Sequence, residues 1–414
     1  MSVKELCVLA KQASYSLGAL PTAQKNNALW AIGRHIQADK DLIFKANQKD
    51  LELAAQNGKP QSFLDRLLLT ESRLQGILEG LDAVAALADP VGEVVEQYTV
   101  KSGLNIKRVR APLGVIGIIY EARPNVTIDA IALTLKSGNA VVLRGSKDAA
   151  NSNAALVNAA KKGLKEAGID ENAVVFLGNP DREDTRVMLA QQGLIDVVIP
   201  RGGEELKKFV LEHALMPVIA SAGGNCHLFV EGSANQEKAI PVIVNAKIQR
   251  PSVCNALETL LVERSIAKEF LPKIAKALEK EKVILRGDDE VRAILPHIEQ
   301  VGIDEYYKEY NDLILKIKIV QDTTCAITHI NKYGTGHSEA IITENKICAQ
   351  QFAQAVDSAA VFINASTRFT DGFEFGLGAE MGISTQKLHV RGPIGLRELT
   401  GVKYVAQGDY TSRG

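Results

Sequence analysis

One cysteine in this sequence stands where a reactive side chain could be presented to a substrate. Cys254 ends the segment 249–254, which lies between a helix-like run at 236–247 and an apolar, strand-like run at 257–262. Ordered connections of this kind commonly carry reactive groups on a rigid scaffold. Arg250 is close by in the sequence, and a nearby cation favours the thiolate, which is the nucleophilic form of cysteine. The segment therefore predicts a nucleophile for an acyl carbon, with a buried structural cysteine as the alternative.

The composition argues against several classes of protein. The 414 residues exceed one typical domain and predict two or three. A formal net charge of -1, without a block of Lys and Arg, gives no sign of nucleic-acid binding. No apolar run is long enough to span a membrane, and residues 1–20 lack a signal-peptide core. The 5 cysteines are an odd number without a Cys-x-x-Cys motif, which argues against a disulfide framework and for the cytoplasm.

The histidines and Cys226 are weaker candidates than Cys254 for a catalytic or metal-binding role. The 7 histidines form no His-Glu-x-x-His motif, so no metal site is predicted. His227, His337 and His389 are expected to be hydrogen-bonded structural residues. Cys226 is a rival nucleophile, but it directly precedes a strand-like run, which favours burial.

Hydrophobic periodicity divides the chain into regions. Residues 24–87 carry apolar side chains at helical spacing, which predicts a helical layer. Strand-like runs at 94–100 and 106–109 flank a short turn and predict a hairpin arm that pairs with another subunit. Short apolar runs then alternate with helical patterns, which predicts α/β domains with parallel sheets. The expected strands are 115–120, 141–143, 174–177, 197–199 and 218–220, followed by 228–230, 257–262, 283–285, 313–320, 340–343 and 360–363.

Polar residues follow one of these strands directly. Arg144, Gly145, Ser146 and Lys147 come after the strand at 141–143. Parallel sheets bind ligands at the carboxyl ends of their strands, and glycine lets a ligand approach the backbone there. Two cations suit the 2′-phosphate of NADP better than the free ribose of NAD. The turn predicts an NADP site, with a solvated turn before a helix as the alternative.

A second turn repeats this arrangement. Arg201, Gly202 and Gly203 follow the strand at 197–199 and precede a helix. The exposed N–H groups at a helix N-terminus favour an anion such as a pyrophosphate. The usual Gly-x-Gly-x-x-Gly fingerprint is absent from the first strand-to-helix turn. The prediction of a dinucleotide site therefore depends on two similar turns in one sheet.

Several segments resemble a known family. Residues 114–119 and 138–143 resemble the cofactor domain of the aldehyde dehydrogenase superfamily, and the glycine pair at 223–224 precedes Cys254 at about that family's distance. More closely, the chain is similar from end to end to the gamma-glutamyl phosphate reductases of proline biosynthesis. The segments that carry this similarity are 120–125, 249–255 and 364–372.

The resemblance implies an aldehyde dehydrogenase-like α/β fold with three parts. These are a Rossmann-type NADPH-binding domain at 1–92 and 110–225, a second α/β catalytic domain at 226–386, and a small β oligomerisation arm at 93–109 and 387–414. It also implies a homo-oligomer, and a transient contact with glutamate 5-kinase that delivers the substrate.

The implied reaction is the NADPH-dependent reduction of L-glutamyl 5-phosphate to L-glutamate 5-semialdehyde and phosphate through a thioester on Cys254. The side chain of Asn125 and the backbone N–H of Cys254 are the candidates that stabilise the oxyanion. Gly223 joins the cofactor-binding set. The candidates for the phosphoryl and α-carboxylate groups of the substrate are Arg250, Ser366, Thr367 and Arg368, with salt-bridged loop residues as the alternative.

One departure from the wider superfamily bears on the reaction. Hydrolytic aldehyde dehydrogenases carry a Glu general base just before the glycine pair, where this chain has Ser221 and Ala222. Without that base, water is not activated to hydrolyse the thioester, which favours reduction. The alternatives are a dehydrogenase for another small aldehyde or acyl phosphate, a non-catalytic dinucleotide-binding homologue, and a cysteine hydrolase.

Overall fold

The computed structural model describes residues 1–178, 181–221 and 223–413. The chain forms two compact units. The first unit comprises Met1–Ala220, Gly376–Gly382 and Ile394–Gly414, and the second comprises Ser221–Phe375 and Ile383–Pro393. Ala222, one of the two residues expected in place of a general base, lies outside the described residues. Among the described residues, no helix combines the length and apolar character needed to cross a bilayer.

A layer of helices begins the first unit, as the periodicity predicted for residues 24–87. An additional helix precedes that region, and its start has a local cause. Ser2 and Glu5 form a capping box, which satisfies N–H groups that the first turn leaves unpaired. The helices are α1 (Val3–Leu17), α2 (Thr22–Ala38), α3 (Lys40–Gln56), α4 (Gln61–Leu67) and α5 (Glu71–Ala86).

The sheet of the first unit is parallel, with the strand order β5-β4-β3-β6. Its central strand β3 is buried along its whole length, which explains its continuous apolar run. The expected strand at 218–220 contributes only an isolated parallel bridge between Val198 and Val218. The strands are β3 (Val115–Tyr120), β4 (Ala140–Arg144), β5 (Val174–Phe176) and β6 (Val197–Arg201). The connecting helices are α6 (Asn125–Lys136), η1 (Lys147–Ala149), α7 (Ala150–Glu166), η2 (Glu171–Ala173), α8 (Arg182–Leu189) and α9 (Glu204–His213).

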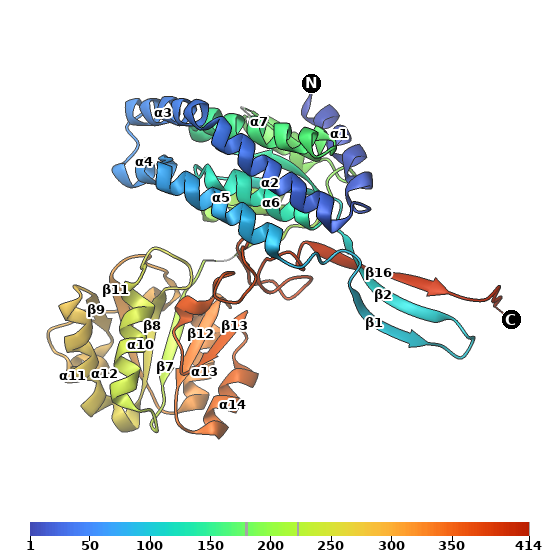
Figure 1. Ribbon diagram of the computed structural model, residues 1–414. Coiled ribbons are helices and arrows are strands. Elements are labelled where there is room, and N and C mark those ends of the chain that lie inside the picture. The colour runs from blue at the N-terminus through green and yellow to red at the C-terminus, as the bar shows by residue number, and fades with distance from the viewer. Residues whose placement is uncertain (179–180, 222, 414) are drawn as a thin grey trace. The chain divides into compact units, whose positions relative to one another are not determined.

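The predicted hairpin is confirmed and gains a third strand. β1 (Val94–Thr99) pairs antiparallel with β2 (Asn105–Pro112), and β16 (Thr400–Gln407) pairs along the other edge of β2. These three strands form a narrow ribbon of their own (Figure 1). Every residue of β1 is exposed and every residue of β2 is half-buried, so neither strand is covered by the residues that the structure describes.

The second unit is built on a seven-stranded parallel sheet with the order β10-β9-β11-β8-β7-β12-β13. Helices α10, α11 and α12 lie on one side of it, and α13 and α14 on the other (Figure 1). Alternation along β7 separates two cores, because Leu228 packs in one and Phe229 in the other. The strands are β7 (Cys226–Val230), β8 (Leu257–Glu263), β9 (Ile284–Gly287), β10 (Glu299–Gln300), β11 (Ile314–Val320), β12 (Ser338–Ile342) and β13 (Ala360–Ile363). The helices are α10 (Gln236–Ile248), α11 (Arg264–Lys280), α12 (Asp289–Ile294), η3 (Ile303–Tyr307), α13 (Thr323–Tyr333), α14 (Lys346–Ala355) and η4 (Thr367–Phe369), and a short pair β14 (Ile383–Ser384) and β15 (Gly392–Pro393) completes the unit.

The α/β fold with parallel sheets is therefore confirmed.

Two helices of the helical layer, α2 and α7, approach each other closely at a glycine. A Cβ on Gly163 of α7 would lie 2.5 Å from the backbone nitrogen of Ile32 in α2, so no side chain fits between them. At Gly76 in α5, by contrast, a Cβ would meet no other atom within 4 Å.

We expect Gly163→Ala to destabilise the protein by about 1–3 kcal/mol, because the helices must separate to admit a methyl group. Gly76→Ala is the matched control and should stabilise by up to about 1 kcal/mol, since alanine favours an exposed helix. Chemical denaturation followed by circular dichroism measures both. Equal stability of the two variants would contradict the packing explanation.

Candidate active site

Cys254 lies on the connection between α10 and β8, as the sequence predicted. The residue is half-buried, whereas Cys7 and Cys226 are fully buried. A backbone bond from the Val253 N–H to the Arg250 carbonyl, 3.4 Å long, tightens the turn before the cysteine. A second turn bond joins Ala256 to Val253 at 3.0 Å. The cysteine is therefore held on an ordered turn at the amino end of a core strand.

The carbonyl group of Cys254 is enclosed by the segment that precedes β7. A Cβ on Gly224 would lie 1.3 Å from the Cys254 oxygen, so only glycine fits at that position. The Cys226 thiol donates a hydrogen bond to the same oxygen over 3.1 Å. Glu309 accepts the Gly224 N–H at 2.8 Å and fixes the glycine in turn. Sequence reasoning missed this role of Gly224, although the spacing of the glycine pair from Cys254 could have suggested it.

Arg368 ties the two ends of the cysteine loop together. Its Nε donates to the Gln249 side chain at 3.0 Å, and its Nη1 donates to the Asn255 side chain. Burial lowers the pKa of this guanidinium, while Asp371 opposes that shift and Arg250 adds to it. Cys254 also interacts electrostatically with Arg368. The cation thus lies beside the cysteine loop.

The other three predicted substrate-binding residues differ in what their side chains do. Thr367 is buried and donates to the Asn255 carbonyl at 2.7 Å. The Ser366 hydroxyl accepts the N–H of Arg368 and caps η4. Arg250 is exposed at the rim of the loop. Thr367 and Ser366 therefore shape the loop, and Arg250 has the exposure that contact with a substrate requires.

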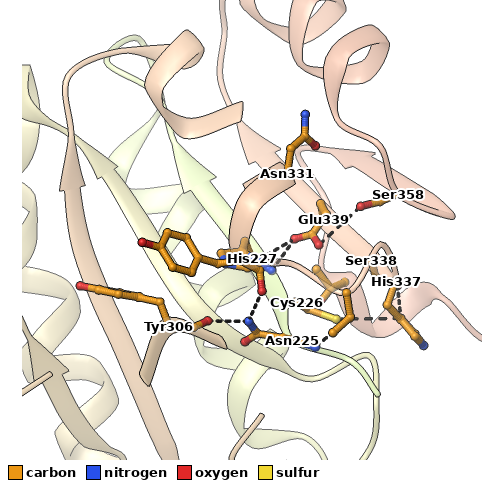
Figure 2. Close-up of polar contacts among 12 residues, drawn as sticks. Asn225, Cys226, His227, Tyr306, Asn331, His337, Ser338, Glu339 and Ser358 are labelled. Atoms are coloured by element: carbon orange, nitrogen blue, oxygen red, sulfur yellow. Dashed lines mark hydrogen bonds and ion pairs between the residues drawn. The ribbon is translucent and has the colours of Figure 1, made fainter. Parts of the chain in front are cut away.

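A buried polar cluster lies beneath the loop, around the start of β7 (Figure 2). The Glu339 carboxylate accepts the His227 N–H at 2.6 Å, and Ser358 donates to its other oxygen at 3.5 Å. Burial raises the pKa of Glu339 well above its usual value and lowers that of His227 to about 3, so the imidazole is neutral at pH 7. The predicted structural role of His227 and the predicted burial of Cys226 are both confirmed.

Two further histidines of the prediction differ in exposure. His337 is fully buried, as expected for a structural residue. His389 is exposed and adopts a positive φ of 68° in the loop before β15. Among the described residues, no group of three or more His, Cys, Asp and Glu side chains is arranged to hold a metal ion.

The first unit carries the turn after β4. Arg144 is held by bonds from Nε to Thr185 at 3.0 Å and from Nη1 to the Gly145 carbonyl at 3.3 Å. Burial lowers the pKa of Arg144. Ser146 caps η1, and Lys147 is exposed. An anionic group could therefore meet the Lys147 ammonium and the turn around Ser146.

The turn after β6 is arranged differently from the prediction. The Gly203 N–H at the start of α9 donates to the Glu121 carboxylate at 3.0 Å. A Cβ on Gly202 would lie 2.8 Å from the same carboxylate oxygen. A carboxylate from the end of β3 thus takes the helix N-terminus that the sequence assigned to a phosphate, and Arg201 ends β6 beside it. Gly223 belongs to the second unit and is half-buried.

Asn125 begins α6 in the first unit and is exposed. Its side-chain amide donates to Asp129 one turn later at 3.1 Å. Burial raises the pKa of Asp129 from 3.8 to about 6, opposed by the Asn125 bond and the charge of Arg201. The amide of Asn125 is therefore oriented by its own helix.

The model of the aldehyde dehydrogenase family matches residues 1–312 of this chain. Gamma-glutamyl phosphate reductase of Carboxydothermus hydrogenoformans is 50% identical over 412 residues, which is 100% of this chain and 99% of the relative. The crystal structure of gamma-glutamyl phosphate reductase from Thermotoga maritima superposes with a TM-score of 0.98 at 47% identity and covers 100% of both chains. An engineered glycolyl-CoA reductase with bound NADP+ shares the fold at a TM-score of 0.68 and 17% identity, covering 98% of this chain and 96% of that one.

The chain therefore belongs to the aldehyde dehydrogenase family. Within that family its place is among the gamma-glutamyl phosphate reductases, with which it aligns along its whole length. The resemblance read from the segments 120–125, 249–255 and 364–372 is confirmed.

The raised pKa of Asp129 gives a pH-dependent prediction. Between pH 3.8 and about 6 the folded chain binds a proton at Asp129 that the unfolded chain has released, so this group's contribution to stability falls as the pH rises. Asp129→Asn should therefore stabilise the protein by about 1–3 kcal/mol above this window, and the gain should vanish below it.

Thermal unfolding at several pH values measures this difference. Asp82→Asn, which replaces an exposed carboxylate on α5, is measured alongside as the matched control. A gain for Asp129→Asn that is equal on both sides of the window would contradict the assignment.

Proposed function

We propose that this chain catalyses the NADPH-dependent reduction of L-glutamyl 5-phosphate to L-glutamate 5-semialdehyde and phosphate, the second step of proline biosynthesis from glutamate. The observation that carries the proposal is a half-buried cysteine on a tied loop, in a chain that matches gamma-glutamyl phosphate reductases from end to end. The proposed nucleophile is Cys254.

The first chemical step forms a thioester. The Cys254 thiolate attacks the C5 carbonyl of the substrate, and the phosphate leaves with the electrons of the C–O bond. The Arg368 guanidinium beside the loop favours the thiolate over the thiol. Because phosphate is a good leaving group, this step needs little help from a general acid.

The second step reduces the thioester, and NADPH when bound supplies the hydride for it. The Cys254 sulfur then leaves the thiohemiacetal carbon, the semialdehyde forms, and the thiolate is restored. Both tetrahedral species carry an oxyanion, for which we propose the backbone N–H of Cys254 and the amide of Asn125. Removal of one such donor typically costs about 100- to 1,000-fold in rate.

The absence of a glutamate at positions 221 and 222 supports reduction over hydrolysis. A general base at that point would activate water against the thioester and release glutamate without using the hydride. The rival function, oxidation of a small aldehyde to its acid, needs such a base. An assay that separates acid from semialdehyde as product distinguishes the two reactions.

For the cofactor we propose the turns at the carboxyl ends of β4 and β6. Lys147 and the capping residue Ser146 fit an anionic group, with Gly145 and Arg144 forming the turn behind them. The set Arg201, Gly202, Gly203 and Gly223 stays part of the proposal, but a phosphate at Gly203 would have to replace the Glu121 carboxylate. We therefore assign the 2′-phosphate of NADPH to the β4 turn.

For the substrate we propose Arg250 as the contact for the phosphoryl or α-carboxylate group, with Arg368, Ser366 and Thr367 shaping the loop around it. Arginine binds both anions through paired N–H groups. Reaction at a free thiol requires a reducing compartment, which supports the cytoplasm as the location.

We also propose a homo-oligomer that forms through the β1-β2-β16 sheet. Large apolar side chains on this sheet are exposed, and pairing with another subunit would bury them. The exposed side chains are Val94, Val95, Tyr98, Val402, Tyr404 and Val405.

We propose in addition that a transient contact with glutamate 5-kinase delivers the labile acyl phosphate.

Replacement of the nucleophile tests the covalent route. Cys254→Ser should abolish NADPH oxidation because a serine hydroxyl is a far weaker nucleophile at neutral pH, while NADPH binding stays intact. Turnover is measured by absorbance and binding by NADPH fluorescence. Near-normal turnover of this variant would refute a thioester on Cys254.

The reverse reaction tests the substrate. Wild-type protein should reduce NADP with glutamate semialdehyde only when inorganic phosphate is present. Reduction without phosphate would identify the product as the free acid and would favour the aldehyde dehydrogenase alternative.

Lys147→Ala should raise the KM for NADPH by about tenfold or more, because a charge-assisted contact to the 2′-phosphate is lost. The KM for NADH should not change, since NADH lacks that phosphate. Lys45→Ala, on the exposed side of α3, is the matched control. An equal effect on NADPH and NADH would contradict the assignment.

A further inference from the structure

Cys226 is a second cysteine close to the nucleophile loop, and the proposed reaction does not use it. It is the first residue of β7 and is fully buried. Burial raises the pKa of its thiol well above the usual value, so the group carries its proton at neutral pH. A protonated thiol is a hydrogen-bond donor, and the acceptor in this structure is the carbonyl oxygen of Cys254, at 3.1 Å.

This bond reaches the Cys254 carbonyl beside Gly224, whose backbone packs directly against the same group. The backbone of Gly224 lies so close that a Cβ there would coincide with the carbonyl group. Sheet pairing beside the loop is also irregular, because the register between β7 and β8 shifts between Cys226 and His227. The contacts at the Cys254 carbonyl therefore lie where the pairing of β7 with β8 is irregular.

A chain of contacts supports Cys226 from behind and returns to the loop. His337 Nδ1 lies 3.9 Å from the Cys226 sulfur and 2.8 Å from the Ser338 hydroxyl (Figure 2). Ser338 donates to the Thr370 hydroxyl at 2.6 Å. The Thr370 carbonyl then accepts the side-chain amide of Asn255 at 2.8 Å. Asn255 follows Cys254 in the chain, so these contacts lead from the Cys226 thiol back to the peptide bond between Cys254 and Asn255.

We infer that Cys226 is a positioning residue for the proposed reaction: its thiol holds the carbonyl of Cys254 and thereby fixes the backbone that carries the nucleophile. The inference rests on the proposed function of Cys254. The sulfur and the proposed oxyanion donor, the Cys254 N–H, belong to the same residue. Rotation of the Cys254 backbone displaces both at once, and small displacements from the attack geometry reduce rates steeply.

Three substitutions at this position separate hydrogen bonding from packing. Cys226→Ala removes the donor and leaves a cavity, Cys226→Val removes the donor and fills the space, and Cys226→Ser keeps a donor. Cys7→Ala is the matched control, because Cys7 is a fully buried thiol in α1 of the first unit. Each protein is first checked for folding by thermal unfolding.

In the reverse reaction, we expect the alanine and valine variants to lose about threefold to tenfold in kcat with unchanged KM values, the effect of one hydrogen bond. The serine variant and Cys7→Ala should keep kcat within about twofold of wild type. Wild-type kcat in both donor-free variants would overturn the inference, as would a serine variant as slow as alanine. If alanine does not fold, the valine and serine pair decides.

A spectroscopic measurement does not depend on activity. The sequence contains one Cys-Asn pair, Cys254–Asn255, so labelling cysteine carbonyls with ¹³C and asparagine nitrogens with ¹⁵N gives one correlation signal. The Cys254 carbonyl signal should move upfield in the alanine and valine variants and stay in place in the serine variant and in Cys7→Ala. An unmoved signal in both donor-free variants overturns the inference. This result stands even if wild-type protein fails to reduce the expected substrate, which would refute only the proposed function.

Discussion

The contact between the Gly224 backbone and the Cys254 carbonyl constrains the whole second unit. A methyl group on residue 224 would occupy the space of the carbonyl oxygen, so the segment before β7 and the segment before β8 can meet only through glycine. The two segments enter adjacent parallel strands. The position of the nucleophile loop is therefore set by the same backbone contact that joins the starts of these two strands.

Beneath that contact, the second unit buries two lysines, and both have hydrogen-bond partners. Lys316 donates to the Asn225 side chain at 2.9 Å, and Lys247 donates to the Leu257 carbonyl at 2.9 Å and to Glu258 at 3.3 Å. Burial lowers the pKa of Lys316 to about 8. A buried charge without such partners would be strongly destabilising, so these bonds fix the ends of β7 and β8 in one arrangement. Lys247 in α10 and Leu257 in β8 lie on either side of the nucleophile loop, so their bond joins the two ends of that loop.

The first unit shows how a sheet can offer similar turns with different roles. After β4 the turn presents an exposed Lys147 and a serine cap, which suit an anion. After β6 the helix N-terminus is already satisfied by the Glu121 carboxylate. Both turns follow the same strand–glycine–helix pattern. Their difference comes from Glu121 at the end of β3, the strand that lies between β4 and β6 in the sheet.

The sequence by itself determined the α/β class, the parallel strands, the hairpin, the family and the place of Cys254 between a helix and a strand. Each of these can be predicted from the sequence because it depends on hydrophobic periodicity or on short contiguous segments. It also pointed to Arg368, through the segment 364–372, but not to the way that residue acts.

Only the tertiary structure decided which side chains meet at the loop. Arg368 and Gln249 are 119 positions apart, and Cys226 and Cys254 are 28 apart. Their contacts exist because β8, β7, β12 and β13 are neighbours in that order. Strand order is set by how two apolar faces are buried at once, and no local pattern in the chain encodes it. The sequence could therefore name the nucleophile, while its support had to be found in three dimensions.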